Sequence, residues 1–209
     1  MNFLLIANLL GVFVFAYSGA LVAARQRMDL FGYIVLGLLP AVGGGTLRDL
    51  ILDVPVFWLQ EPLNILVALA AALFAFAVPI VVGKRLTLLT WADALGLSLF
   101  CVMGAAKAFD ITGNVIIAVT MGVITAVVGG ILRDVVANEV PLVLVREIYA
   151  SAALAGACVY CAAFTLGAPT GIALMAGGAV AFALRAAGIV LNLGLPVRRL
   201  RQPDDSPDD

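Results

Sequence analysis

The sequence predicts an all-α polytopic membrane protein with seven transmembrane helices, organised as two inverted three-helix repeats plus a seventh helix. The first observation is composition: of 209 residues, 64% are hydrophobic and 12% are charged, whereas soluble domains are about 45–50% apolar and about 25% charged. The second is a series of apolar segments of about 20 residues, the length that spans a hydrocarbon core of about 30 Å. The third is an internal repeat with an offset of 85 residues.

Seven apolar segments account for most of the chain. They comprise residues 3–24, 30–53, 62–83, 87–107, 113–137, 145–166 and 171–195. No basic region or convincing cleavage site accompanies the first segment, so we expect it to be a spanning helix and not a signal peptide. The last stretch, residues 202–209, is rich in Pro, Asp and Ser, which is typical of a solvated, disordered tail.

The repeat is clearest in one motif. Gly43-Gly44-Gly45-Thr46-Leu47-Arg48-Asp49 returns as Gly129-Gly130-Ile131-Leu132-Arg133-Asp134, and positions 7–49 share 15 identities with the residues 85 positions further on. Because three helices are an odd number, the second unit must enter the membrane from the opposite face, and folds built this way commonly place their pathway between the repeats. The expected units are 1–86 (first repeat), 87–167 (second, inverted repeat), 168–197 (seventh helix) and 198–209 (cytoplasmic tail).

Glycines fall inside the second and fifth helices. At 1.5 Å per residue, Gly43 lies about 20 Å along a helix that begins at Leu30. Consecutive glycines after Pro40 weaken a helix, so we expect helices 2 and 5 to be broken, with freed backbone groups facing protein or water. This favours a pathway lined by Gly43, Gly44, Gly45, Thr46, Thr125, Gly129 and Gly130. The alternative is that the glycines only let helices approach closely.

Charges within the spans are candidates to support or gate this pathway, because intramembrane charges are expensive. They are Arg48, Asp49, Asp93, Lys107, Arg133, Asp134 and Arg185. Adjacent helical residues point in different directions, so we expect neither Arg–Asp pair to bond within itself. We expect an ion pair between Arg133 and Asp93, and a neutral contact between Arg48 and Asn8, the repeat equivalent of Asp93. The alternative is that these charges only cap and orient half-helices.

Two further charges are open to more than one interpretation. Lys107, with Asp110 three residues later, is expected either to extend to the membrane interface or to line an outer vestibule. Arg185, deep in the seventh helix, is expected either to pair with Asp134 or to extend inward.

Basic residues are concentrated on one predicted face of the membrane. That face holds Arg25, Arg27, Lys84, Arg85, Arg133, Arg146, Arg198, Arg199 and Arg201, and the other holds Arg48 and Lys107. By the positive-inside rule, the C-terminus is expected to be cytoplasmic and the N-terminus outside.

The sequence does not indicate an enzyme. It contains no His, no nucleophile–base pair and no metal-ligand cluster, and its glycine motif lacks the spacing and lysine of a P-loop. Cys158 and Cys161 form C-x-x-C without partner ligands, so we interpret them as small helix residues. We therefore predict no catalytic residue, metal, cofactor or nucleic-acid partner.

Two three-helix units with Gly-Gly-x-Leu-Arg-Asp, followed by a seventh helix, resemble the bacterial branch of the trimeric intracellular cation (TRIC) channels. The repeat of that family is also known as a "glycine transporter" domain. The resemblance covers residues 2–196. It implies a homotrimer in the lipid of the bacterial inner (plasma) membrane, with the N-terminus outside.

The resemblance also implies one pore per subunit, lined by kinked helices 2 and 5 and conducting K⁺ and also Na⁺. Val128 stands where the first copy has Gly43, so the second break is expected to be milder. The residues themselves do not select the ion. A secondary transporter of a small solute such as glycine, and a scaffold whose glycines serve packing, remain alternatives.

Overall fold

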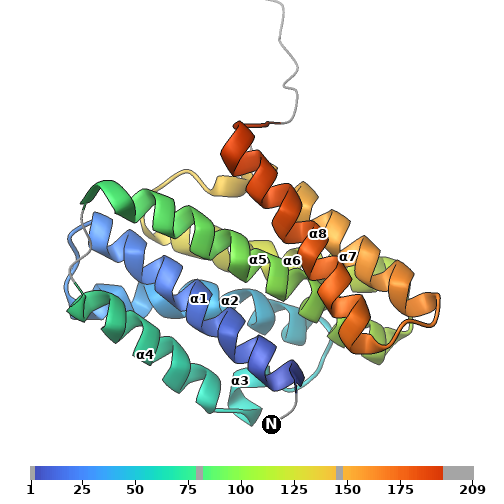
Figure 1. The fold of residues 1–209 in the computed structure, drawn as a ribbon. Coiled ribbons are helices and arrows are strands. Elements are labelled where there is room, and N and C mark those ends of the chain that lie inside the picture. Colours follow the sequence, from blue (N-terminus) through green and yellow to red (C-terminus); the bar gives the residue numbers. More distant parts are fainter. Residues whose placement is uncertain (1–2, 79–81, 145–147, 195–209) are drawn as a thin grey trace, which may run out of the picture.

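The computed structural model describes residues 3–78, 82–144 and 148–194, which form a bundle of helices (Figure 1). The elements are α1 (Phe3–Arg25), α2 (Leu30–Ile51), α3 (Phe57–Gln60), α4 (Leu63–Ala77), α5 (Val82–Thr112), α6 (Val115–Val136), the 3-10 turn η1 (Leu142–Leu144), α7 (Ala150–Thr165) and α8 (Thr170–Leu191). In this described part, α1, α2, α5, α6 and α8 are long and apolar enough to cross a membrane, and α4 and α7 are shorter apolar helices.

Each predicted segment overlaps one of these seven helices, with two main differences. The helix α5 begins at Val82 and ends at Thr112, beyond both ends of the predicted segment 87–107, so Lys84 and Arg85, predicted to separate two spans, belong to its first turns. Lys and Arg favour a helix, so these charges extend α5 beyond its apolar segment. The short elements α3 and η1 were not predicted. The tail at 198–209 lies outside the described residues.

The helices pack as two three-helix units and one addition. The first unit contains α1, α2 and α4, and the second contains α5, α6 and α7. The two units meet where α1 packs on α5 and α2 packs on α6, and α8 covers α5 and α7. In Figure 1 the blue-to-teal helices of the first unit lie on one side of the bundle, and α7 and α8 (orange to red) lie on the other.

Contacts between the units are reciprocal. The rings of Phe15 and Phe100, which are equivalent positions of the repeat, lie 5.2 Å apart. A Cβ added to Gly11 would lie 3.3 Å from the Phe100 ring, and one added to its equivalent Gly96 would lie 2.1 Å from the Phe15 ring. The same two positions therefore contact each other twice, with the roles of the two units exchanged. This reciprocity indicates that the units are related by a two-fold axis.

The crossing of α2 and α6 has the same reciprocity. A Cβ added to Gly44 would lie 2.1 Å from the carbonyl oxygen of Thr125, and one added to Gly129 would lie 2.5 Å from that of Pro40. Gly44 and Gly129 are equivalent positions, and so are Pro40 and Thr125. Only glycine permits such an approach of two backbones.

The predicted breaks in the second and fifth helices are wrong. Both α2 and α6 are helical from end to end. Glycine costs a helix only about 1 kcal/mol relative to alanine, and here it gains close contact with the facing helix. Pro40 leaves the carbonyl of Leu36 without its usual partner. Gly19 of α1 lies against that oxygen, since an added Cβ would be 1.9 Å away.

Candidate functional site

Two polar pockets lie near the Arg–Asp motifs. The first, which we call the Arg48 pocket, has a volume of about 260 Å³ and is lined by Leu4, Asn8, Arg48, Phe57, Gln60, Glu61, Asn64, Met103, Ala106, Lys107 and Asp110. The second, which we call the Arg133 pocket, has a volume of about 200 Å³ and is lined by Val22, Arg25, Leu89, Thr90, Arg133, Asp134, Glu139, Val140 and Leu142.

The two pockets are equivalent cavities, one in each repeat. Five lining positions of the Arg48 pocket are displaced by the repeat offset of 85 residues from five lining positions of the Arg133 pocket. The equivalent pairs are Leu4 and Leu89, Arg48 and Arg133, Phe57 and Leu142, Lys107 and Val22, and Asp110 and Arg25. The last two pairs differ in charge, so the duplicated cavity has been altered on each side.

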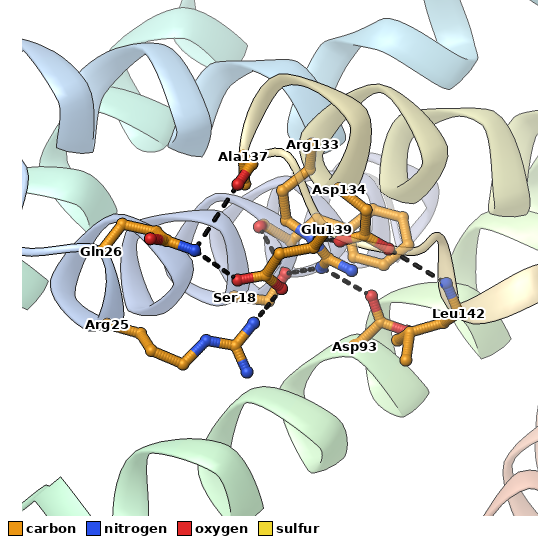
Figure 2. A network of polar contacts seen from close by, with 10 residues as sticks. Ser18, Arg25, Gln26, Asp93, Arg133, Asp134, Ala137, Glu139 and Leu142 are labelled. Atoms are coloured by element: carbon orange, nitrogen blue, oxygen red, sulfur yellow. Dashed lines mark hydrogen bonds and ion pairs between the residues drawn. The ribbon is translucent and has the colours of Figure 1, made fainter. Parts of the chain in front are cut away.

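Arg133 lies at the centre of a buried polar network (Figure 2). Its side chain is fully buried, and its Nη1 donates to Asp93 Oδ1 at 2.8 Å and to Ser18 Oγ at 3.0 Å. Its Nε donates to Asp134 Oδ1 at 2.8 Å. The predicted Arg133–Asp93 ion pair is therefore confirmed. Because a buried charge is costly without compensation, these partners explain how α6 holds a guanidinium at this depth.

Arg48 has different surroundings in the equivalent position. Its guanidinium bonds to Asp49 Oδ1 through Nε and Nη2, both at 2.8 Å, and lies 5.9 Å from the Phe57 ring centroid. The predicted contact with Asn8 is wrong, because the Asn8 amide donates to Asn64 Oδ1 at 2.6 Å. A neutral amide competes poorly with a carboxylate for a guanidinium.

The expectation that adjacent Arg and Asp residues do not pair is also wrong. In both motifs the Arg Nε donates to the carboxylate of the next residue at 2.8 Å. Directions at Cβ do diverge for neighbouring helical residues. The long arginine side chain nevertheless curves back far enough to reach the neighbouring carboxylate.

The carboxylates also turn the chain after each helix. Asp49 Oδ2 accepts the backbone N–H of Phe57 at 2.9 Å, and Asp134 Oδ2 accepts that of Leu142 at 3.1 Å. Between each aspartate and the residue whose N–H it accepts, the chain reverses direction through a residue with left-handed backbone, Asp53 (φ 52°) in the first copy and Asn138 (φ 55°) in the second. These contacts fit the alternative role of orienting the chain, and they hold α3 and η1 against the pockets.

The predicted pathway residues lie between the two pockets. Along α2, Arg48, Gly44 and Pro40 are separated by about one turn each, and α6 passes through Thr125, Gly129 and Arg133 in the opposite sense. The close crossing therefore separates the pocket at Arg48 from the pocket at Arg133. That these glycines line a pathway stays a prediction.

The hydroxyls of the two threonines are engaged within their own helices. Thr46 Oγ1 donates to Val42 O at 2.7 Å and accepts the Trp58 Nε1–H at 2.9 Å. Thr125 Oγ1 donates to Met121 O at 2.6 Å.

The remaining predicted pathway glycines contact bulky side chains. Added Cβ atoms would approach Leu132 at Gly43, Phe57 at Gly45 and Tyr149 at Gly130.

The two remaining charges reach different partners. Lys107 lies in the wall of the Arg48 pocket, and its Nζ is 2.8 Å from Asp49 Oδ1. This agrees with the vestibule interpretation. Arg185 is fully buried, and its Nη1 donates to Ile148 O at 3.4 Å while its guanidinium lies 5.2 Å from the Tyr149 ring centroid.

A more exposed contact covers the Arg133 pocket. Arg25, at the end of α1, forms an ion pair with Glu139, and Gln26 Nε2 donates to Glu139 Oε1 at 2.8 Å and to Ala137 O at 3.5 Å (Figure 2). We call these three side chains, Arg25, Gln26 and Glu139, the latch. The equivalents of Arg25 and Glu139 are Asp110 and Val54, so the Arg48 pocket cannot form it.

Sequence reasoning missed several residues that the structure brings to these sites: Ser18, Asn64, Glu139 and Tyr149. Asn64 and Tyr149 are 85 positions apart and lie beside the equivalent residues Asn8 and Asp93. Sequence comparison does not reveal this pair, because Pro55 and Glu61 recur at an offset of 86, as Pro141 and Glu147. Within the described residues, no group of three His, Cys, Asp or Glu side chains is placed to hold a metal ion.

Comparison with known proteins matches both repeats. A family model described as "Glycine transporter" matches residues 5–79 and again residues 90–165, which leaves α8 outside. The chain is 43% identical over 195 residues to the UPF0126 inner membrane protein YadS of Escherichia coli K12, covering 90% of this chain and 93% of that protein. It is 37% identical over 201 residues to a UPF0126 membrane protein of Vibrio cholerae, covering 93% and 82%.

Solved structures are similar along almost the whole chain. The TRIC trimeric intracellular cation channel orthologue of Rhodobacter sphaeroides shares 46% sequence identity with a TM-score of 0.87, covering 92% of this chain and all of that one. Another TRIC cation channel shares 38% identity with a TM-score of 0.85, covering 97% and 100%. A Caenorhabditis elegans channel at 14% identity and a TM-score of 0.59 shares the fold alone.

Proposed function

The chain belongs to the TRIC channel family, whose repeat is the glycine-transporter domain, and from this premise we propose that it is a K⁺ channel that also passes Na⁺. The family is one of channels and not of enzymes, as predicted. The observation that carries the proposal is the pair of equivalent polar pockets on the two sides of the α2–α6 crossing. A cavity repeated by an internal two-fold relation is the arrangement expected of a path that opens to both faces of a membrane.

The membrane arrangement follows from the same relation. We propose that the two units are inserted in opposite senses, since their contacts are reciprocal at both α1–α5 and α2–α6. The bias in basic residues supports an N-terminus outside and a cytoplasmic C-terminus. The Arg48 pocket then opens outward and the Arg133 pocket inward. The relatives support a bacterial inner-membrane location, and their trimeric structures support a homotrimer surrounded by lipid.

We place one pathway in each subunit. It begins in the Arg48 pocket, passes the contacts of Gly44 with Thr125 and of Gly129 with Pro40, and ends in the Arg133 pocket. These contacts close the path in the arrangement described, because backbone carbonyls already touch the facing glycines. Conduction requires α2 and α6 to separate or rotate here, which would present the glycine backbone to the ion.

Charge in the two pockets supports a cation. The wall of the Arg48 pocket carries two cations, Arg48 and Lys107, and two carboxylates, Glu61 and Asp110. The buried Asp49 carboxylate lies behind this wall and pairs with both cations. The wall of the Arg133 pocket likewise carries Arg25 and Arg133 with Asp134 and Glu139, and the buried Asp93 pairs with Arg133. With these buried carboxylates included, each site has one more acidic than basic side chain, and an excess of one charge attracts ions of the opposite sign.

The deciding experiment is a planar-bilayer recording of purified protein in asymmetric KCl. We expect unitary currents that reverse near the K⁺ equilibrium potential, with smaller currents when NaCl replaces KCl on one side. Absence of unitary currents from a protein that elutes as an intact trimer would contradict the proposal.

A secondary transporter of a small solute is the second candidate, favoured by two pockets that do not join. Such a site would open alternately to the two faces. Proteoliposomes separate the candidates: a transporter shows saturable uptake of labelled glycine without unitary currents. A channel shows the reverse.

A further inference from the structure

The family repeat does not include α8, yet α8 supplies a fully buried charge to the second unit. Arg185 is 0% exposed and lies in a helix beyond the matched repeats, which end at residue 165. A buried guanidinium is costly to maintain, so a helix that served only as cover would more economically carry an apolar residue there. The position of Arg185 therefore requires an explanation.

Arg185 packs on Tyr149, whose side chain extends to the Arg133 network. Its guanidinium carbon lies 5.2 Å from the Tyr149 ring centroid, and its Nη1 donates to the preceding carbonyl, Ile148 O, at 3.4 Å. Gly188, one turn further along α8, lies against Ile148, since an added Cβ would be 3.2 Å from Ile148 Cβ. Two successive turns of α8 thus fix the start of α7.

The Tyr149 hydroxyl points into the Arg133 network. A Cβ placed on Gly130 would lie 2.9 Å from Tyr149 Oη, 3.7 Å from Arg133 Nη2 and 3.9 Å from Asp93 Oδ1. These three groups therefore surround the same face of α6, and Tyr149 itself is 2% exposed. A guanidinium held over the ring restricts the tilt of the ring, and with it the position of the hydroxyl.

The first unit has no equivalent of this arrangement. The counterparts of Tyr149 and Asp93 are Asn64 and Asn8, which bond to each other directly at 2.6 Å. A small amide pair needs no external support. The larger Tyr149 side chain does, and α8 supplies that support; among the described helices, none covers the first unit in the same way.

We propose that Arg185 is a positioning residue for conduction. It holds Tyr149 against the Arg133–Asp93 pair and so stabilises the closed arrangement of the Arg133 pocket. This inference rests on the proposed channel function and assigns α8 a regulatory role within it. Removal of Arg185 frees Tyr149 and shifts the subunit toward the conducting state. Since coupling between sites is typically fivefold or more, we expect Arg185→Gln to raise the open probability at least about fivefold.

A double-mutant cycle tests whether Arg185 acts through Tyr149. Purified trimers of wild type, Arg185→Gln, Tyr149→Phe and the double variant are compared by bilayer recording in symmetric KCl. We expect both single variants to raise the open probability, and Arg185→Gln to have little further effect once the hydroxyl is absent. Tyr160→Phe is the matched control, because Tyr160 is a similarly buried tyrosine in α7, the helix that Tyr149 precedes, but it stacks on Phe164.

A second readout does not need current. In a background without the native cysteines, Leu142→Cys places a thiol in the wall of the Arg133 pocket, and its reaction with a membrane-impermeant thiol reagent measures access to that pocket. We expect Arg185→Gln to speed labelling about fivefold or more. If wild type carries no current, the proposed function fails, while labelling still tests the inference.

Two outcomes overturn the proposal: unchanged open probability and labelling in Arg185→Gln, or effects of the two single variants that multiply in the double variant. If Arg185→Gln does not form trimers, Arg185→Lys replaces it. Lysine keeps the charge but loses the planar contact, so we expect a smaller change in the same direction that also disappears with Tyr149→Phe.

Discussion

The two Arg–Asp motifs have the same backbone and different surroundings. Arg133 is fully buried and bonds to Asp93, Asp134 and Ser18, whereas Arg48 shares Asp49 with Lys107, whose side chain is 32% exposed at the pocket wall. The positions that face each arginine differ between the units: Asp93 and Ser18 in one, Asn8 and Met103 in the other. The repeat thus preserves the backbone turn that ends each helix, and leaves the electrostatics of each pocket free to diverge.

This difference has a physical consequence. A buried network in a low dielectric is strong when complete and costly when any partner is removed. A partly exposed pair is weaker, is screened by salt and tolerates rearrangement. We therefore expect the Arg133 side to behave as the stable half of the proposed pathway and the Arg48 side as the adaptable half.

The largest expected effect comes from breaking the buried pair. Asp93→Ala leaves Arg133 with an uncompensated part of its charge and should destabilise the folded protein by about 3–5 kcal/mol. The matched change in the other unit, Asn8→Ala, removes one neutral hydrogen bond and should cost about 1 kcal/mol. Thermal unfolding in detergent measures both. Equal losses at the two positions would show that the units do not differ in the way proposed.

The next effect tests what the two units share. Gly44→Ala and Gly129→Ala each push a Cβ against a backbone carbonyl, at 2.1 and 2.5 Å, and overpacking of this kind costs about 1–3 kcal/mol. We expect both to lower thermal stability to a similar degree. Gly171→Ala is the control, because nothing lies within 4 Å of its added Cβ. A large loss at only one of the two crossing glycines would argue against an equivalent role for them.

These two predictions also separate what the sequence could and could not supply. The Arg133–Asp93 pair could be predicted because the places of the two residues along their spans put both at the same depth on the cytoplasmic side of the membrane. The helix breaks were predicted wrongly from the low helix propensity of glycine, which tertiary contacts readily override. The sequence of one helix does not reveal whether a second helix packs closely against its glycines, because that distance depends on the tertiary structure.

Other features depend on side-chain reach and on folding of the loops. The pairing of Arg48 with Asp49 was missed because the direction rule for helices describes Cβ atoms and ignores the length of arginine. Tyr149 was missed because it lies outside the glycine motif, although its equivalent, Asn64, sits in the other pocket. The contact between Arg185 and Tyr149 depends on where α8 docks, which no repeat predicts.

On the Arg48 side, the charge of the pocket should affect the single-channel conductance. Asp110→Asn removes a carboxylate from the Arg48 pocket and should reduce single-channel K⁺ conductance roughly twofold at low ionic strength, since local cation concentration follows the pocket charge. In 1 M KCl, where screening acts within about 3 Å, the difference should largely vanish. Bilayer recordings at the two concentrations measure this. An equal loss in high salt would assign Asp110 a structural role.

The smallest effect is expected at the latch. The side chains of Arg25 and Glu139 are 38% and 23% exposed, and ion pairs of this kind contribute about 0.2–1 kcal/mol. Glu139→Gln should therefore change stability little, but labelling of Leu142→Cys in the pocket beneath should speed up by roughly two- to fivefold, the equilibrium shift that such an energy produces. The charge reversal of both partners, Arg25→Glu with Glu139→Arg, should restore slow labelling, because the pair re-forms with opposite polarity. Since Asp110 and Val54 occupy the equivalent positions, the Arg48 pocket should be accessible to reagent without any substitution. Slow labelling on that side would mean that another contact closes it, and that the difference between the two pockets does not arise from the latch.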